Sequence, residues 1–142
     1  MFSIFAIRKP VKINITMEQK YIYDLHSDHK EWMNKVVFYK EDLKYLRNRL
    51  AEILLKNSSI EVRAMAEHFQ NQYILQDERA DIVRHDINKS MEALQATIVE
   101  NGTAVDHRKV NDENVLREDV EMFEKIFNEL RRESINFFAK WM

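Results

Sequence analysis

The chain has 142 residues, which fits a single domain long enough to bury a core. It contains no cysteine, which excludes disulfides, thiol catalysis and thiolate metal sites, and its net charge of −2 lacks the basic excess typical of nucleic-acid-binding proteins. One glycine and one proline leave few places to turn, so the composition predicts a small number of long helices.

Residues 1–16 differ from the rest of the chain. Apolar and polar residues alternate from Val11 to Ile15, which predicts a short extended N-terminal arm. The opening apolar run precedes the basic pair Arg8-Lys9, the reverse of the order in a secretory signal, and no later stretch reaches membrane-spanning length. We therefore expect a cytoplasmic protein that does not bind membranes.

A first helix is predicted at about residues 17–57. Its apolar stripe advances in alternating steps of three and four residues, which is the pattern of a coiled-coil seam, the row of side chains that faces the neighbouring helices. The stripe comprises Ile22, Leu25, His29, Trp32, Val36, Tyr39, Leu43, Leu46, Leu50 and Ile53.

A second helix is predicted at about residues 59–100, after the break at Asn57-Ser58-Ser59. Ser58 and Glu61 have the spacing of a capping box. So short a connection predicts antiparallel neighbours, and equal rise along both helices places Tyr39 opposite Gln76. The second stripe comprises Val62, Ala66, Phe69, Tyr73, Gln76, Ala80, Val83, Ile87, Ser90 and Leu94.

A third helix is predicted at about residues 104–142, after the turn signal Asn101-Gly102-Thr103. Residues 104–114 are polar, and the pattern leaves open whether they form helix or loop. The register places Phe123 opposite Ala80 and Phe137 opposite Ala66, large against small as interdigitated packing requires. The third stripe comprises Leu116, Val120, Phe123, Phe127, Leu130, Ser134, Phe137 and Trp141.

These elements predict an all-α fold. We expect an antiparallel, up-down-up bundle of three long helices with coiled-coil-like packing, formed by residues 17–142 as one domain and preceded by the arm at 1–16.

A metal site is one functional hypothesis. His26 and His29 are spaced i,i+3, Asp86 falls at their level in the expected register, and Glu113 or Glu118 of the third helix could approach. Such a ligand set would suit Zn or Fe. The competing interpretation is one seam histidine bonded to a neighbour, with the other histidines in solvent and no cofactor.

A polar shoulder follows one edge of the second stripe and consists of His68, Gln72, Arg79 and Asp86, beside the core-facing Gln76. It predicts either a groove that recognises a polar partner or a buried polar layer that fixes the register of the helices.

The C-terminal aromatics are the third candidate. Phe138 lies about 100° around the helix from Phe137, so we expect one of the two to face outward. Phe138 and Trp141 then form a contact site for a protein partner or a second copy. Burial of both by the first inter-helix turn is the alternative.

The stretches FYKEDLKYLRNRLAEIL, EHFQNQYILQDERADIVRHDIN and LRRESINFFAKWM resemble a family of short, uncharacterised bacterial helical proteins, over residues 17–142. The resemblance implies a helical bundle and carries no established chemistry. It leaves the function open. The absence of a phosphate loop or nucleophile motif favours a non-enzymatic interaction or scaffold module. We expect a homodimer, because a thin three-helix rod leaves its shoulders and aromatic ends partly exposed. The alternative function is the metal-binding bundle.

Overall fold

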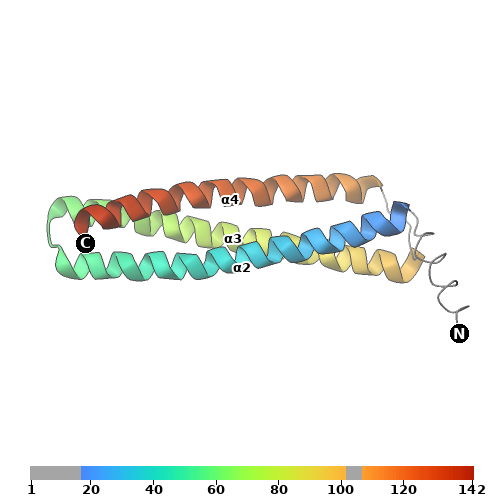
Figure 1. Cartoon of the computed structure of the whole chain (residues 1–142), viewed down its shortest axis with the longest axis horizontal. Helices are drawn as coiled ribbons and strands as arrows, with labels where there is room; N and C mark the ends of the chain where they lie inside the picture. Colours follow the sequence, from blue (N-terminus) through green and yellow to red (C-terminus); the bar gives the residue numbers. More distant parts are fainter. Residues whose placement is uncertain (1–16, 102–106) are drawn as a thin grey trace, which may run out of the picture.

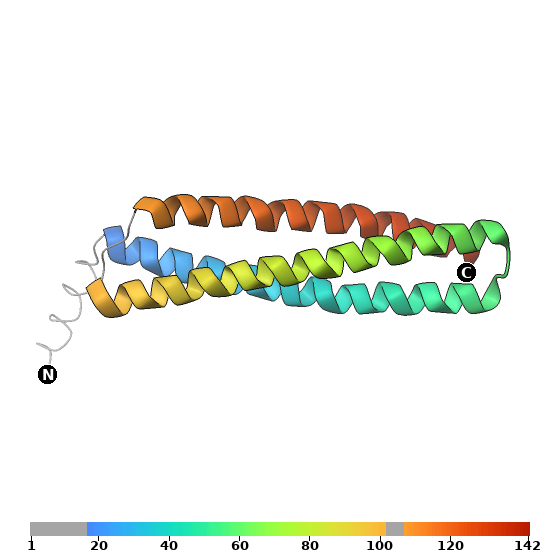
Figure 2. The same cartoon turned by 180° about the vertical axis from the view of Figure 1, so that it is seen from behind.

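The computed structural model describes residues 17–101 and 107–142, which form three helices and no strand. Helix α2 spans Met17–Lys56, α3 spans Ile60–Asn101 and α4 spans His107–Trp141. They lie side by side as an elongated up-down-up bundle (Figures 1 and 2). The predicted all-α fold is therefore confirmed. The arm at residues 1–16 lies outside the described residues.

The polar stretch that the sequence left open is helical where the structure describes it. Residues 107–114 form the first turns of α4, whereas residues 104–106 lie outside the described part. None of the described helices holds a stretch long and apolar enough to cross a membrane.

The three predicted stripes form the interior of the bundle. Every stripe residue is buried except Ser90 and Trp141, which are half-buried. Ala66 and Ala80 lie in the same buried cluster as Trp32, Phe123 and Phe137. The small and large residues of the stripes thus share one core, as interdigitated packing requires.

The observed register of α3 against α4 lies within about one turn of the expected one. Phe137 packs its ring against Phe69, with 5.1 Å between centroids, and Phe69 lies about one turn along α3 from the expected partner Ala66. On the other side of α3, Lys40 pairs with Asp77 and Asp81, close to the position expected from the predicted pairing of Tyr39 with Gln76.

The connection between α2 and α3 is closed by Asn57 and Ser59. The amide of Asn57 donates to the carbonyls of Ile53 (3.0 Å) and Trp141 (3.1 Å), so it caps α2 and holds the last turn of α4. The backbone N–H of Val62 donates to Ser59 Oγ at 3.2 Å. The N-cap of α3 is therefore Ser59, and the prediction of a capping box beginning at Ser58 was wrong.

Helices α2 and α4 run parallel, and a row of ion pairs follows their contact. Asp28 pairs with Arg117 (2.8 Å), Lys35 with Glu124 (3.6 Å) and Asp42 with Arg131 (3.2 Å), one heptad apart on each helix. These are the positions that flank the seam of a parallel coiled coil.

The signs along this row alternate, which favours the observed register of α4 on α2. A slip of one heptad would place Asp28 beside Glu124 and Lys35 beside Arg131. Like charges would then meet at each of these positions, whereas the observed register pairs opposite charges throughout.

The prediction that one of Phe137 and Phe138 faces outward is wrong. Both are buried, with 7% and 5% of their surface exposed. Phe138 follows Arg131 by one heptad, so it faces α2 at the end of the bundle closed by Asn57. The alternative that both aromatics are buried near the first turn is the correct one. Trp141 is half-buried and packs against the same core.

Because Phe138 belongs to the core, we expect Phe138→Ala to lower the free energy of unfolding by about 3–5 kcal/mol. Ile135→Ala is the matched control, since Ile135 lies on the same helix with 44% of its surface exposed; its effect should stay within about 0.5 kcal/mol. Urea denaturation followed by circular dichroism measures both. Equal losses in the two variants would contradict the burial of Phe138.

Candidate functional site

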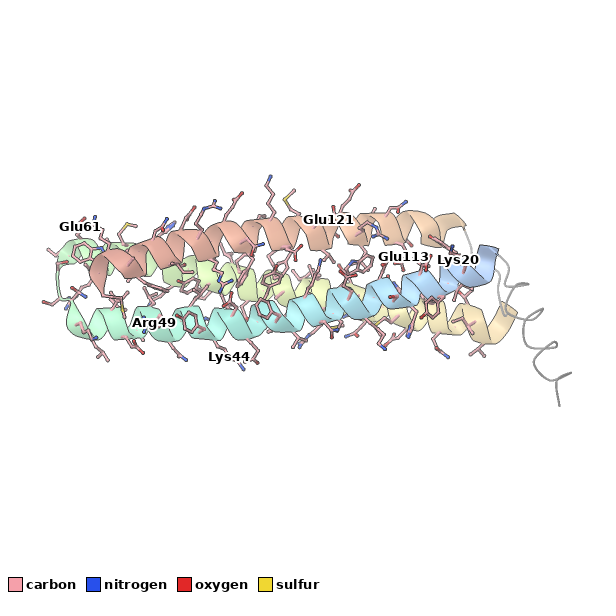
Figure 3. All side chains as sticks on the ribbon, viewed as in Figure 1. Lys20, Lys44, Arg49, Glu61, Glu113 and Glu121 are labelled. Atoms are coloured by element: carbon pink, nitrogen blue, oxygen red, sulfur yellow. The ribbon has the colours of Figure 1, made fainter. Side chains whose placement is uncertain are left out.

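The most buried ionisable pair joins α2 to α4. His29 is fully buried and Glu113 is 6% exposed, and His29 Nε2 lies 2.8 Å from both Glu113 carboxylate oxygens. Figure 3 shows Glu113 between α4 and α2. Glu121 of the same helix is exposed. A carboxylate accepts hydrogen bonds, so Nε2 carries the donated hydrogen.

His29 lies in the interior because it occupies a seam position of α2, between the stripe residues Leu25 and Trp32. The pair lies between two apolar groups, a main core that begins at Trp32 and a small cluster of Ile22, Leu25 and Leu94. His29 and Glu113 therefore form a polar layer across the interior near one end of the bundle.

Further polar and aromatic groups surround this layer. The guanidinium of Arg117 lies 5.2 Å from the Trp32 ring centroid while it pairs with Asp28, and the His29 and Trp32 rings are 5.7 Å apart. Burial raises the pKa of Tyr21, and the negative charge of Glu113 raises that pKa further. The charges of Arg117 and Glu113 both act on Tyr21, so the two residues lie at the same end of the bundle.

The arrangement offers little room for a substrate. The adjacent cavity has a volume of about 50 Å³ and is lined by Leu25, Ser90, Ala93, Leu94, Thr97, Asp112 and Glu113. That space suits ordered water rather than a metabolite. His29 Nδ1 has no hydrogen-bond partner in the described structure. The geometry therefore favours a structural polar layer over acid–base catalysis.

The predicted metal ligands are not brought together. His26 is exposed, Asp86 lines a separate hollow, and Nε2 of His29 is engaged by Glu113. Residues 17–101 and 107–142 contain no group of three or more histidine, aspartate or glutamate side chains that could hold a metal ion. The approach of Glu113 to His29 agrees with the interpretation of one bonded seam histidine.

Two more polar contacts hold α4, and neither was predicted from the sequence. Tyr39 donates its hydroxyl hydrogen to Glu124 at 2.8 Å, and Tyr73 donates to Ser134 at 2.7 Å. Together with Glu113 and the carbonyl of Trp141, they bind α4 at intervals along its length. Ser134 within an apolar stripe was the available signal for the second contact.

The polar shoulder divides into one buried residue and an exposed row. Gln76 is buried, and its Oε1 has no hydrogen-bond partner in the described structure. Tyr39, which was expected opposite Gln76, bonds to Glu124. Arg79 is exposed and Asp86 is half-buried. His68 and Gln72, exposed and half-buried, complete the row.

A hollow between α3 and α4 shows which way this row faces. Its volume is about 290 Å³, and its lining includes Asp86 and Lys89 of α3 with Val115 and Asp119 of α4. Since His68, Gln72, Arg79 and Asp86 share one side of α3, the whole shoulder faces the α4 side. The shoulder does not form the buried polar layer, which consists of His29 and Glu113.

The chain matches no model of a known protein family, no curated protein and no solved structure. The resemblance to a family of bacterial helical proteins stays a prediction.

Removal of either partner of the His29–Glu113 pair should leave the other buried without its hydrogen bond. We expect His29→Leu and Glu113→Leu each to lower the free energy of unfolding by about 1–3 kcal/mol, and the double variant to lose less than the sum. His26→Leu is the exposed control and should change stability little. Additive losses in the double variant would show that the two side chains do not interact.

Tyr39 should make stability depend on alkaline pH. Burial, and next the hydrogen bond to Glu124, raise its pKa from 10.0 to about 12. The folded state therefore holds the phenolic proton more tightly than the unfolded state. This contribution is complete below pH 10.0 and is lost as the pH rises through about 12.

Tyr39→Phe should flatten this alkaline decline, as measured by urea denaturation across the same pH range. Burial also raises the pKa of Tyr73, so Tyr73→Phe serves as the comparison and should remove a separate part of the slope. An unchanged slope in Tyr39→Phe would rule out its role.

Proposed function

We propose that this protein is a non-enzymatic helical bundle that acts as an interaction or scaffold module and associates with itself in the cytoplasm. The buried polar contacts support this proposal because they hold α4 in place against both neighbouring helices. Glu113, Glu124 and Ser134 all bond to side chains of the neighbouring helices.

A surface formed by α3 and α4 carries the proposal. Leu75 and Ile82 of α3 are 50% and 57% exposed, and Val115 and Met122 of α4 are 57% and 49% exposed. In each helix the two residues are one heptad apart, so they share a side of that helix. We call these four residues the α3–α4 face.

The residues of this face gather on one side of the bundle. The hollow between α3 and α4 brings Lys89 and Val115 together, and the two helices are antiparallel. Ile82 lies one heptad from Lys89, and Met122 lies one heptad from Val115 in the same direction along the bundle. Ile82 and Met122 therefore lie opposite each other across the contact of α3 with α4. Gathered apolar side chains on a surface are typical of protein contact sites.

Self-association is tested by multi-angle light scattering of the full chain over a wide range of concentrations. We expect the mass to approach that of a dimer as the concentration rises. A mass that stays at the monomer value throughout would remove the self-association part of the proposal.

A further inference from the structure

The charges beside the α3–α4 face differ from those at the other helix contacts. Along α2, Lys40 pairs with Asp77, and Asp28 pairs with Arg117. In the described part of the chain, by contrast, neither Arg79 nor Asp86 of α3 makes an ion pair. These two opposite charges face the same side as the exposed apolar residues and are available to a partner.

The spacing of these residues is symmetrical along α3. Arg79 and Asp86 are one heptad apart, and Ile82 lies between them on the same side of the helix, three residues after Arg79 and four before Asp86. Reversing the direction of the helix about Ile82 therefore exchanges the positions of Arg79 and Asp86 to within one residue. The surface is complementary in charge to its own antiparallel copy.

Resting on the proposed self-association, we propose that a second copy of this chain packs antiparallel on α3, with a two-fold axis at Ile82. Arg79 of each copy then faces Asp86 of the other, and the two Ile82 side chains meet at the axis. A two-fold contact of this kind is isologous, so each ion pair occurs twice.

The neighbouring residues fit this arrangement. Equal rise along two antiparallel helices places Leu75 of one copy beside Lys89 of the other, whose aliphatic stem can cover it while the ammonium group stays in solvent. Met122 of α4, opposite Ile82 in the groove, widens the apolar centre of the contact.

The charges also distinguish this arrangement from its competitors. A parallel pair of α3 helices would bring Arg79 against Arg79 and Asp86 against Asp86, which is repulsive. An unrelated partner would need complementary charges of its own, whereas a second copy supplies them through the symmetry of this one helix.

Charge reversal tests the contact without disturbing the core, since Arg79 is exposed and Asp86 is half-buried. Arg79→Asp and Asp86→Arg each turn two attractive pairs into two repulsive ones. We expect each to raise the dimer Kd by about tenfold or more, as measured by analytical ultracentrifugation. The double variant R79D/D86R should return the Kd close to that of the wild type.

The matched control is Arg132→Asp, the same charge change at an exposed position on α4, which should leave the Kd unchanged. Because the chain has no cysteine, Ile82→Cys provides a second measurement. Two residues at the axis should oxidise rapidly to a disulfide-linked dimer, whereas Leu55→Cys, at a residue 89% exposed near the α2–α3 turn, should link far more slowly.

The outcomes separate this inference from the broader proposal. Weakening by both single variants with rescue by the double variant supports the two-fold contact on α3. A dimer Kd that is unchanged in all three variants overturns the contact on α3 but leaves self-association standing. A double variant whose Kd does not return close to that of the wild type has the same meaning. A wild type that is monomeric throughout overturns both.

Discussion

Three helices packed side by side enclose a single strip of interior, and this constraint decides the role of nearly every side chain. Each helix of this protein contributes one stripe to that strip and leaves most of its circumference in solvent. Polar residues inside the strip are cut off from water, and His29 and Tyr73 bond to side chains of a neighbouring helix. Apolar residues outside it, such as Ile82, remain exposed unless another molecule covers them.

The fold could be predicted because the periodic stripes form most of the interior. Steps of three and four residues over the length of each helix marked the buried stripes, and Asn57 with its neighbours marked the first reversal. The expected direction of each helix followed from the shortness of the connection. The interaction of His29 with a glutamate of α4 was also within reach, since Glu113 falls near its level.

The features that could not be predicted depend on backbone and side-chain geometry that the spacing of one apolar stripe does not specify. Phe138 is buried because each helix touches two neighbours, so the positions flanking a stripe can also lie inside. The choice of Ser59 over Ser58 as N-cap depends on the backbone of a three-residue connection. The hydroxyl contacts of Tyr39 and Tyr73 depend on side-chain rotamers, which the hydrophobic pattern does not specify.

The odd number of helices has a mechanical consequence. Met17 at the start of α2 and Trp141 at the end of α4 lie at opposite ends of the bundle (Figure 1). Tension between these two points would therefore load the helices lengthwise and pull α2 and α4 in opposite directions along their contact. Sliding of α2 along α4 would break the buried contact of Glu113 and the three flanking ion pairs in the same movement.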